Sequence, residues 1–346
     1  MKKDIIISFV IPAYNSEKTI IRTLKSFNYE KKDNFEVIIV NDGSTDNTVK
    51  ITNEWIKKNN LKDTINIFTK TNGNWGSVMN YASKIVKGKY IKIVDSDDEI
   101  NKKTFNEILF FLKSKVPNDI DICAVPFTIY NENEQKNIQK RNGIFKRKPY
   151  ILQLANKKLN FFIFTHHMLI FKKEIFINAC PLVEKYFYSD NLLIFKTLVN
   201  TEKIYIFSKK IVSYKYYVGN QEQSISINNY INRREHVFNV YKKILETKIP
   251  KNISENKKKY IVDFIFNILY LLVLLTILDK KNTNVETNNI IDGYLQTTKQ
   301  FKSKELILSS FYYKIICNKN LRTLLRIINK FIYKFAWFGF FKAIKS

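Results

Sequence analysis

Cysteine is scarce in this chain of 346 residues. The three cysteines, Cys123, Cys180 and Cys317, lie far apart, with no C-x-x-C pair and no neighbouring histidine. This spacing excludes a disulfide framework and a zinc finger, and it is typical of a reducing compartment. Glycine and proline are also few, at 8 and 6 residues, whereas 45% of the residues are hydrophobic. The composition therefore excludes a disordered or collagen-like chain and predicts a sizeable buried core.

A long apolar run is also missing. The longest, residues 264–278, has 15 residues and contains Asn267, whereas a membrane-spanning helix needs about 20. The apolar N-terminal run is broken by Pro12 and has no small-residue cleavage site, so it predicts a strand and no signal peptide. The sequence thus predicts no transmembrane helix.

Acidic residues are outnumbered by basic ones. Lysine and arginine total 58 against 31 acids, for a formal net charge of +27. Such a surplus indicates a polyanionic partner, which could be nucleic acid, an anionic membrane face or a phosphorylated substrate. A general compositional bias toward lysine, asparagine and isoleucine is the alternative explanation.

Short β-branched runs alternate with helical patterns over residues 4–127. The expected strands are residues 5–11, 35–40, 65–69, 90–94 and 121–127. The expected helices are residues 17–28, 45–58, 77–86 and 102–115. This alternation predicts an α/β fold whose mainly parallel sheet is covered by helices on both faces. Because ligands bind beyond the carboxyl ends of such strands, the residues after each strand are the first candidates for a site.

The second half of the chain has a different pattern. We expect strands at 161–171 and 204–217, with a helix at 190–200 between them, and helices from about residue 230 onward. This pattern predicts one domain over 1–230 that consists of two halves, residues 1–127 and residues 128–230. Residues 231–346 are expected to form a helical C-terminal region, which is rich in basic and aromatic residues.

Polar and aromatic residues follow the first three strands. Tyr14 follows Pro12 and could stack on a base, and Asp42 could accept a hydrogen bond from a ring N–H. Two glycines in the segment 71–77 would let backbone N–H groups approach a diphosphate near a helix N-terminus. The segment is neither G-x-G-x-x-G nor a Walker loop, which excludes a dinucleotide dehydrogenase and a P-loop protein at this position.

Four acids follow the fourth strand within five residues. They are Asp95, Asp97, Asp98 and Glu99. Without a cation these carboxylates would repel one another and raise each other's pKa. A hard divalent ion such as Mg²⁺ or Mn²⁺ accepts oxygen ligands and also bridges phosphate oxygens. The cluster therefore predicts a metal site, with a solvated acidic helix cap as the alternative.

Taken together, these segments resemble a known family. FVIPAYNSEKTI, VNDGSTDNT, TNGNWGSVMNYA and GKYIKIVDSDDEI are similar, in order and spacing, to the inverting family 2 glycosyltransferases of the GT-A fold over residues 5–105. The chain differs from the usual family pattern N-G-G-x-x-x-A-R-N at two positions, Trp75 and Met79. The arginine that members often place at Met79 is missing, so phosphate neutralisation must come from elsewhere.

The resemblance implies roles for individual residues. Pro12, Tyr14 and Asp42 would hold the nucleobase, and Asp95 would lie toward the ribose and donor sugar. The full implied nucleotide-binding set is Pro12, Tyr14, Glu17, Asp42, Asn72 and Asp95. Asp97, the second acid of D-x-D, would bind the Mn²⁺ or Mg²⁺ that bridges the donor diphosphate.

An inverting transferase also needs a general base near the acceptor hydroxyl. The family usually supplies an aspartate at the start of a helix in the second half, and Asp190 fits that description. An ordinary helix cap is the alternative explanation for Asp190, and Asp98 and Glu184 are the next candidates for the base.

Three further features bear on the acceptor side. His166 and His167 are expected in the middle of a strand, with one side chain on each face. One of them could line the acceptor pocket, and the alternative is a buried histidine whose ring nitrogens are hydrogen-bonded within the protein. Neither is proposed as a metal ligand. The segment around Gln223 resembles the G-x-x-x-Q-S-x-S loop of capsule-type members, with Arg233 just beyond it. Such a loop could close over the diphosphate.

The last 45 residues combine ten basic residues and one acid with many aromatics. This composition is typical of a helix in an anionic membrane interface, and a tail packed on the catalytic domain is the alternative. We therefore expect a cytoplasmic protein that is peripheral on the inner face of the cell membrane.

The sequence as a whole predicts a metal-dependent inverting glycosyltransferase. It would move a hexose or N-acetylhexosamine from a UDP-sugar to a hydroxyl of a lipid-linked saccharide in bacterial capsule, surface polysaccharide or glycolipid synthesis. Two alternatives are a non-catalytic GT-A-like scaffold and a basic nucleic-acid-binding protein. The second gives no reason for the acidic cluster, so no nucleic-acid partner is expected.

Overall fold

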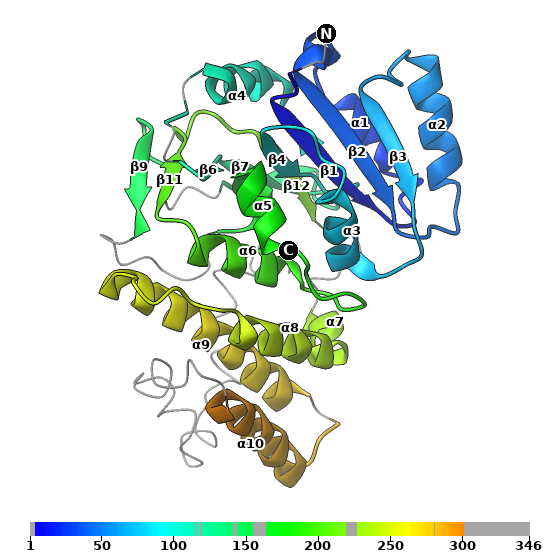
Figure 1. Ribbon diagram of the computed structural model, residues 1–346. Helices are drawn as coiled ribbons and strands as arrows, with labels where there is room; N and C mark the ends of the chain where they lie inside the picture. Colours follow the sequence, from blue (N-terminus) through cyan, green and yellow to red (C-terminus); the bar gives the residue numbers. More distant parts are fainter. Residues whose placement is uncertain are drawn as a thin grey trace.

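A computed structural model of the chain describes residues 4–114, 116–117, 120–140, 144–154, 164–218, 227–279 and 281–300. Two sheets and their helices form the upper part of the molecule, and a layer of long helices lies beneath them (Figure 1). The basic and aromatic tail, the segment around Gln223 and Cys317 lie outside the described residues.

The larger sheet has eight strands in the order β3-β2-β1-β4-β10-β6-β11-β9. The strands are β1 (Ile7–Ala13), β2 (Phe35–Asn41), β3 (Ile65–Thr69), β4 (Tyr90–Ile93), β6 (Ile122–Ala124), β9 (Tyr150–Gln153), β10 (Leu169–Lys172) and β11 (Lys203–Ile206). The four strands from β3 to β4 are mutually parallel, and β10 runs antiparallel to both of its neighbours. This mixed, mainly parallel sheet is the one that the alternating sequence pattern predicts.

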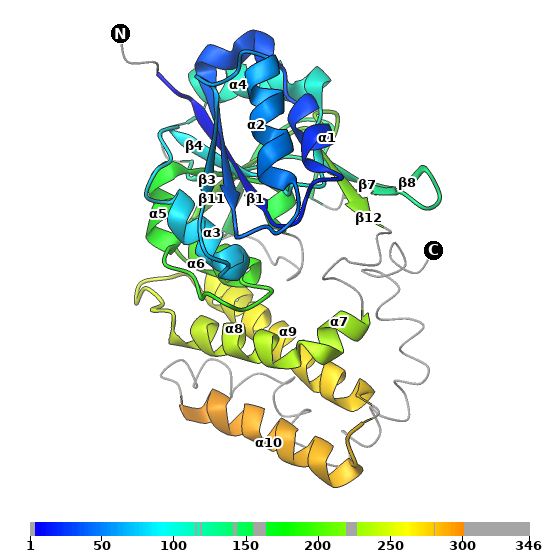
Figure 2. The ribbon, with the colours of Figure 1, turned by 90° about the vertical axis from the view of Figure 1, so that its right-hand side faces the viewer.

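Helices cover both faces of the parallel part (Figure 2). On one side lie α1 (Ile20–Lys25) and α2 (Thr48–Lys58), and on the other α3 (Asn74–Ala82) and α5 (Lys173–Ala179). The chain moves outward from β1 to β3 and then returns to β4, so right-handed crossovers place α3 on the opposite face from α1 and α2. Every residue of β2 is buried, as expected for a strand covered on both sides.

The first strand continues past its proline. Pro12 was expected to stop the strand, yet it pairs in register with Val40 of β2, and the strand ends only at Ala13. β4 pairs with β1 only as far as Val10, so the edge of β1 that faces β4 is free at Pro12. A missing N–H costs nothing at a free edge.

A second sheet covers one end of the first. Its order is β5-β12-β7-β8, with β5 (Glu99–Ile100), β7 (Phe127–Asn131), β8 (Lys136–Lys140) and β12 (Tyr214–Val218). The strands expected at 121–127 and 204–217 are therefore each divided between the two sheets, as β6 with β7 and β11 with β12. Pro126, which cannot donate a ladder hydrogen bond, lies at the first division.

The expected strand at 161–171 is also different in its described part. His166–Met168 form a 3-10 helix, η4, and only Leu169–Lys172 form a strand. The expectation that His166 and His167 face opposite sides of a strand is therefore wrong. Successive side chains of a 3-10 helix are about 120° apart and not 180°, so neighbours can reach the same space.

Helices make up the described part of the chain from Ile227 onward. They are α7 (Ile227–Asn232), α8 (Arg234–Glu246), α9 (Glu255–Leu278) and α10 (Asn284–Gln300). Two helices of the upper layer are α4 (Lys102–Ser114) and α6 (Asp190–Val199), and α6 packs on α8 and α9. The α7–α10 layer thus supports the helix that carries Asp190.

One described helix, α9, is long and apolar enough to cross a membrane by length and composition. It has 24 residues, more than the 15-residue run that the sequence analysis counted, because the helix begins nine residues earlier at Glu255. Most of its apolar window, 61%, is buried inside the protein, against helices such as α8 and α10.

Gly76 allows α3 to approach the loop that precedes Asp190. A Cβ at Gly76 would lie 2.1 Å from the carbonyl oxygen of Val183 and 3.0 Å from Oγ of Ser189. We expect Gly76→Ala to lower the free energy of unfolding by about 1–3 kcal/mol, since backbone must move to admit the methyl group. Gly293→Ala is the matched control, because a Cβ there meets nothing within 4 Å and alanine favours a helix. Urea unfolding of both variants measures the difference, and equal midpoints would contradict this packing.

Candidate functional site

A pocket of about 420 Å³ lies beyond the carboxyl ends of β1, β2 and β4. Its walls include the predicted residues Pro12, Tyr14, Asp42, Asn72, Asp95 and Asp97. The parallel strands end at the same edge of the sheet, so residues that are far apart in sequence meet there. On the opposite side the pocket is lined by His166, His167 and Asp190. The structure thus brings together most of the residues that the sequence singled out.

Asp42 is held in place by the loop that follows β3. Its Oδ1 accepts hydrogen bonds from the Gly73 backbone N–H at 3.0 Å and from Nζ of Lys70 at 2.9 Å. These contacts fix the neighbouring Asn72, which is exposed at the pocket. Tyr14 also has an exposed ring, at 54% of its surface. A flat aromatic face therefore stands free at the mouth of the pocket.

Glu17 lies elsewhere than predicted. It is not among the described residues that line the pocket, and its Oε2 accepts hydrogen bonds from the backbone N–H and the side-chain amide of Asn47. In return, Oδ2 of Asp46 accepts a hydrogen bond from the Glu17 backbone N–H. Because Glu17 satisfies donors at the N-terminus of α2, we correct its predicted role from nucleotide contact to linkage of two loops.

Asp98 is also removed from the predicted set. Its side chain is fully buried and accepts hydrogen bonds from the Tyr214 hydroxyl at 2.6 Å and the Tyr217 backbone N–H at 2.8 Å. The Asp95 backbone N–H in turn donates to the Tyr214 hydroxyl. Asp98 therefore ties β12 to the acidic loop and does not face the pocket, which makes it neither a base nor an acceptor contact.

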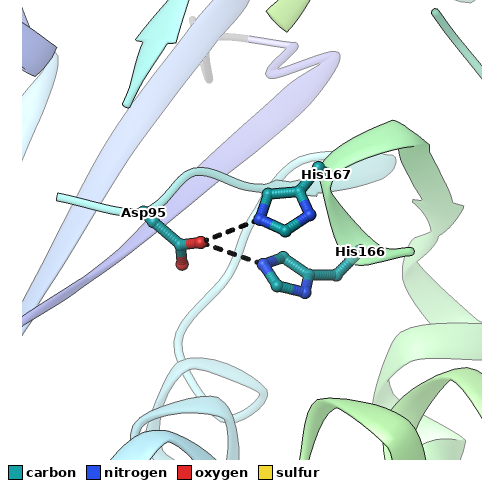
Figure 3. Close-up of side chains that lie close together, drawn as sticks. All are labelled: Asp95, His166 and His167. Carbon is teal, nitrogen blue, oxygen red and sulfur yellow. Dashed lines mark hydrogen bonds and ion pairs between the residues drawn. The ribbon is translucent and has the colours of Figure 1, made fainter. Parts of the chain in front are cut away.

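Asp95 contacts both histidines of the 3-10 turn (Figure 3). Its Oδ2 lies 3.0 Å from Nε2 of His166 and 3.3 Å from Nε2 of His167. Lys92 of β4 stabilises the turn, because its ammonium donates to the backbone carbonyls of His166, His167 and Leu169. Lys92 is only 2% exposed. This buried lysine, which the sequence analysis did not single out, positions the histidine pair.

The charges of this cluster shift each other's pKa values. Burial alone would lower the pKa of His166, but the Asp95 and Asp190 carboxylates outweigh it and raise the pKa to about 9. Burial and the neighbouring His166 lower the pKa of His167 to about 4. Burial opposes ionisation of Asp95, yet the two histidines hold its pKa well below the usual range. The turn thus supplies the positive charge that balances Asp95.

Asp97 lines the same pocket. Burial and the negative charge of Asp95 raise the pKa of Asp97 to about 6, and a cation next to the carboxylate would favour its ionised form. None of the described residues that line the pocket is a lysine or an arginine. The donor set and the lack of a competing basic side chain at these walls fit a divalent ion.

Asp190 begins α6 on the far side of the histidines from Asp95. Its Oδ2 lies 3.6 Å from Nδ1 of His166, so the imidazole ring of His166 separates the two carboxylates. The Asp190 side chain is 32% exposed, and the pocket gives a ligand access to it. In this position Asp190 could act as a base on a ligand that is bound in the pocket near Asp95.

Several lining residues were missed by the sequence analysis. Trp75 packs against the His166 ring, with centroids 5.5 Å apart, and Tyr188 stacks on Tyr230 at 4.3 Å. Within the described part of the chain, Nε1 of Trp75, Oγ of Ser189 and Nδ1 of His166 are buried without a hydrogen-bond partner. Such atoms around a cavity suit a ligand that carries several hydroxyl groups. The run of aromatic residues at 186–188, just before the predicted base, was the sequence feature that could have indicated an aromatic pocket wall.

Two remaining predictions concern the closing loop. Arg233 does not line the pocket but stacks on the ring of Phe187, which does, with its guanidinium carbon 3.8 Å from the ring centroid. Arg233 therefore supports a pocket wall, and its predicted contact with the closing loop stays a prediction, because that loop lies outside the described residues. Gln223 lies outside the described residues. Met79 is fully buried in α3, so the position of the family's arginine does not reach the pocket.

The family model of Glycosyl transferase family 2 matches residues 8–179, which include both the acidic loop and the histidine turn. A relative in Mycoplasma genitalium, the uncharacterized glycosyltransferase MG025, is 29% identical over 217 residues, covering 59% of this chain and 66% of that protein. The poly(ribitol-phosphate) β-N-acetylglucosaminyltransferase TarS of Staphylococcus aureus is 38% identical over 107 residues, covering 30% of this chain and 18% of TarS. The chain thus matches less than two-thirds of the length of these relatives.

A solved structure shares the fold over a longer range. The crystal structure of S. aureus TarS 1–349 in complex with UDP-GlcNAc aligns with a TM-score of 0.63 and 20% identity, covering 90% of each chain. At this identity the likeness shows the fold. It confirms the GT-A architecture that the sequence resemblance implied, including the helical C-terminal part.

Proposed function

Because this chain belongs to Glycosyl transferase family 2 and is a glycosyltransferase, we propose that it moves a hexose or N-acetylhexosamine from a UDP-sugar to a saccharide hydroxyl. The observation that carries the proposal is the single pocket in which the strand-end residues of the first half face Asp190 of the second half. A transferase needs such a pocket, because the donor and the acceptor must meet across one carbon atom.

The proposed reaction inverts the configuration at the anomeric carbon. Asp190 accepts the proton of the attacking hydroxyl, and the nucleoside diphosphate leaves toward the Asp95 side. The position of Asp190 opposite Asp95, with His166 between them, supports this direction of attack. Aromatic walls such as Tyr188 and Tyr230 help to exclude water, which protects the donor from hydrolysis.

A divalent cation is part of the proposal. Asp97 would hold it, and when bound it supplies positive charge to the donor diphosphate. The elevated pKa of Asp97 and the lack of lysine and arginine among the described lining residues support this assignment. Of the proposed ions, Mn²⁺ and Mg²⁺ both accept carboxylate ligands.

UDP-GlcNAc is the first donor to test, because TarS, which shares the fold, is bound to it in its crystal structure. We also propose that the acceptor is a lipid-linked saccharide and that the protein works in the cytoplasm on the inner membrane face, as part of surface polysaccharide or glycolipid synthesis. The basic and aromatic composition of residues 302–346 supports the membrane proposal.

One experiment tests donor, acceptor and surface together. The full chain is incubated with Mn²⁺, one of several UDP-sugars or GDP-mannose, and glycolipid or ribitol-phosphate saccharides, presented free or in vesicles. Mass spectrometry should detect the gain of one hexose or N-acetylhexosamine from a UDP-sugar, with faster transfer on anionic than on neutral vesicles. Transfer from GDP-mannose alone would contradict the donor, and equal rates on both vesicles would contradict the membrane proposal.

Tyr14 should contribute to nucleotide affinity through stacking. Tyr14→Ala removes a ring that is exposed at the pocket mouth, and the loss of one base stack costs about 1–3 kcal/mol. We expect UDP to bind roughly tenfold or more weakly, with little change in stability because the ring is exposed. Isothermal titration of UDP measures this, with Tyr14→Phe as the control that keeps the ring. An unchanged affinity for Tyr14→Ala would show that the base does not stack there.

A further inference from the structure

We propose that Asp95, His166 and His167 together bind one transition-metal ion, such as Mn²⁺, Co²⁺ or Zn²⁺, in the absence of nucleotide. The inference rests on the proposed function, because it specifies how the same pocket holds its cation. It goes beyond the assignment to Asp97 and reverses the expectation that neither histidine is a metal ligand. That expectation assumed a strand, in which the two rings could not meet.

Nε2 of His166 and Nε2 of His167 both face the same carboxylate oxygen of Asp95 (Figure 3). Oδ2 of Asp95 lies 3.0 Å from Nε2 of His166 and 3.3 Å from Nε2 of His167, and the potential ligand atoms all lie within 4.8 Å of one another. Metal bonds to carboxylate and imidazole are about 2.0–2.2 Å long, so ligands at 90–110° are roughly 3.0–3.5 Å apart. The two distances from Asp95 to the histidines therefore fit a shared ion.

The opposite ring nitrogens have the environment that metal-bound histidines require. Nδ1 of His166 and Nδ1 of His167 are buried and without a hydrogen-bond partner among the described residues. A neutral imidazole that binds a metal through Nε2 carries its proton on Nδ1. For His166 this proton points toward Oδ2 of Asp190 at 3.6 Å. A carboxylate in that position orients a metal-bound ring.

The site is also rigid before any ion binds. The His166 and His167 side chains are only 8% and 11% exposed, and Lys92 fixes the backbone carbonyls of their turn. Trp75 packs against the His166 ring, and Tyr216 lies against the His167 ring with centroids 4.3 Å apart. Rings that are already oriented lose little entropy when they bind a metal.

The ligand types indicate which metals the site prefers. Two imidazoles and one carboxylate suit Mn²⁺, Co²⁺ and Zn²⁺, whereas Mg²⁺ and Ca²⁺ prefer oxygen ligands. The carboxylates of the acidic loop alone would not discriminate against Mg²⁺ in this way. Selectivity among metals therefore separates the proposed site from a site built only on Asp97.

The test is direct metal binding to the full chain without nucleotide. Free Mn²⁺ is measured by electron paramagnetic resonance during titration, and Co²⁺ by its visible absorption. We expect one Mn²⁺ per chain, displaced by Zn²⁺ but not by a tenfold excess of Mg²⁺. His166→Gln and His167→Gln should each weaken Mn²⁺ binding at least tenfold, and His236→Gln is the control, because His236 contacts the Phe187 backbone N–H and is not a pocket-lining residue.

Two results would overturn the proposal. One is a wild-type chain that binds no transition metal without nucleotide, or that binds Mg²⁺ as well as Mn²⁺; this comparison needs no variant and so does not depend on variant folding. The other is unchanged Mn²⁺ binding in both histidine variants together with its loss in Asp97→Asn. In either case UDP binding in the presence of Mg²⁺ is measured on the same samples. If UDP still binds, the proposed function stands without this metal site, and if it does not, the proposed function fails too.

Discussion

Asp190→Asn should lower the turnover number for sugar transfer by about 100- to 10,000-fold, the range that a positioned general base contributes. Asparagine keeps the shape of the side chain and an oxygen that can face His166, but it cannot accept the proton of the acceptor hydroxyl. UDP affinity should stay within about threefold of wild type, because Asp190 lies on the far side of His166 from Asp95. Steady-state kinetics and UDP titration together measure this separation of chemistry from binding.

Glu184→Gln is the matched control for this prediction. Glu184 was the other acid in the same segment considered as a base, and its carboxylate accepts a hydrogen bond from the Asn80 amide at 2.9 Å. It is not among the described residues that line the pocket. Its variant should keep transfer within a few-fold of wild type. If Asp190→Asn retained more than a tenth of the activity, or Glu184→Gln lost most of it, the base would have to be reassigned.

Lys92→Met should lower the free energy of unfolding by about 3–5 kcal/mol, the usual cost of breaking a buried charged contact by removing one partner. The substitution keeps the length of the side chain but removes the ammonium group that donates to the carbonyls of His166 and His167. Burial lowers the pKa of Lys92 to about 7, while Asp95 and Asp98 favour its charged form, so the substitution also removes this interaction with the two carboxylates. Because the histidine turn loses its support, Mn²⁺ binding should weaken as well.

Lys89→Met provides the comparison for this effect. Lys89 lies three residues earlier and pairs with Asp4, but both side chains are exposed, at 63% and 72%. An exposed pair contributes at most about 1 kcal/mol. Guanidinium unfolding of both variants should therefore give a large shift of the midpoint for Lys92→Met and a small one for Lys89→Met. Similar shifts would mean that Lys92 does not support the turn.

The strand-end side of the pocket could be predicted because its residues follow short, mainly apolar strands. Such strands are buried on both faces, their carboxyl ends share one edge, and Asp42, Asn72 and Asp95 follow them directly. For these residues the sequence order alone fixes the approximate place in space. Glu17 was assigned to the nucleotide, but its carboxylate accepts a hydrogen bond at the N-terminus of α2. A glutamate suits both a nucleotide contact and a helix cap, so its residue type does not distinguish them.

The acceptor side was harder to predict because its geometry depends on contacts between distant segments. The histidine turn looks like part of an apolar strand, and its 3-10 conformation is stabilised by contacts with other segments, such as the donation by Lys92 to its carbonyls. A lysine within the apolar run YIKIVD was the signal that the interior contains polar groups. Asp98 could not be told from Asp97 by sequence, because their different directions follow from pairing with Tyr214 of the second sheet.

The central claim is that the strand-end pocket binds a uridine nucleotide through a divalent cation. The most direct measurement is a thermal-shift titration of the full chain with UDP, with and without Mn²⁺, on the wild type and on Asp97→Ala. Stabilisation that grows with UDP concentration and requires both Mn²⁺ and Asp97 is the predicted result. If UDP does not stabilise the wild-type protein in the presence of Mn²⁺, the account of this pocket as a sugar-nucleotide site is wrong.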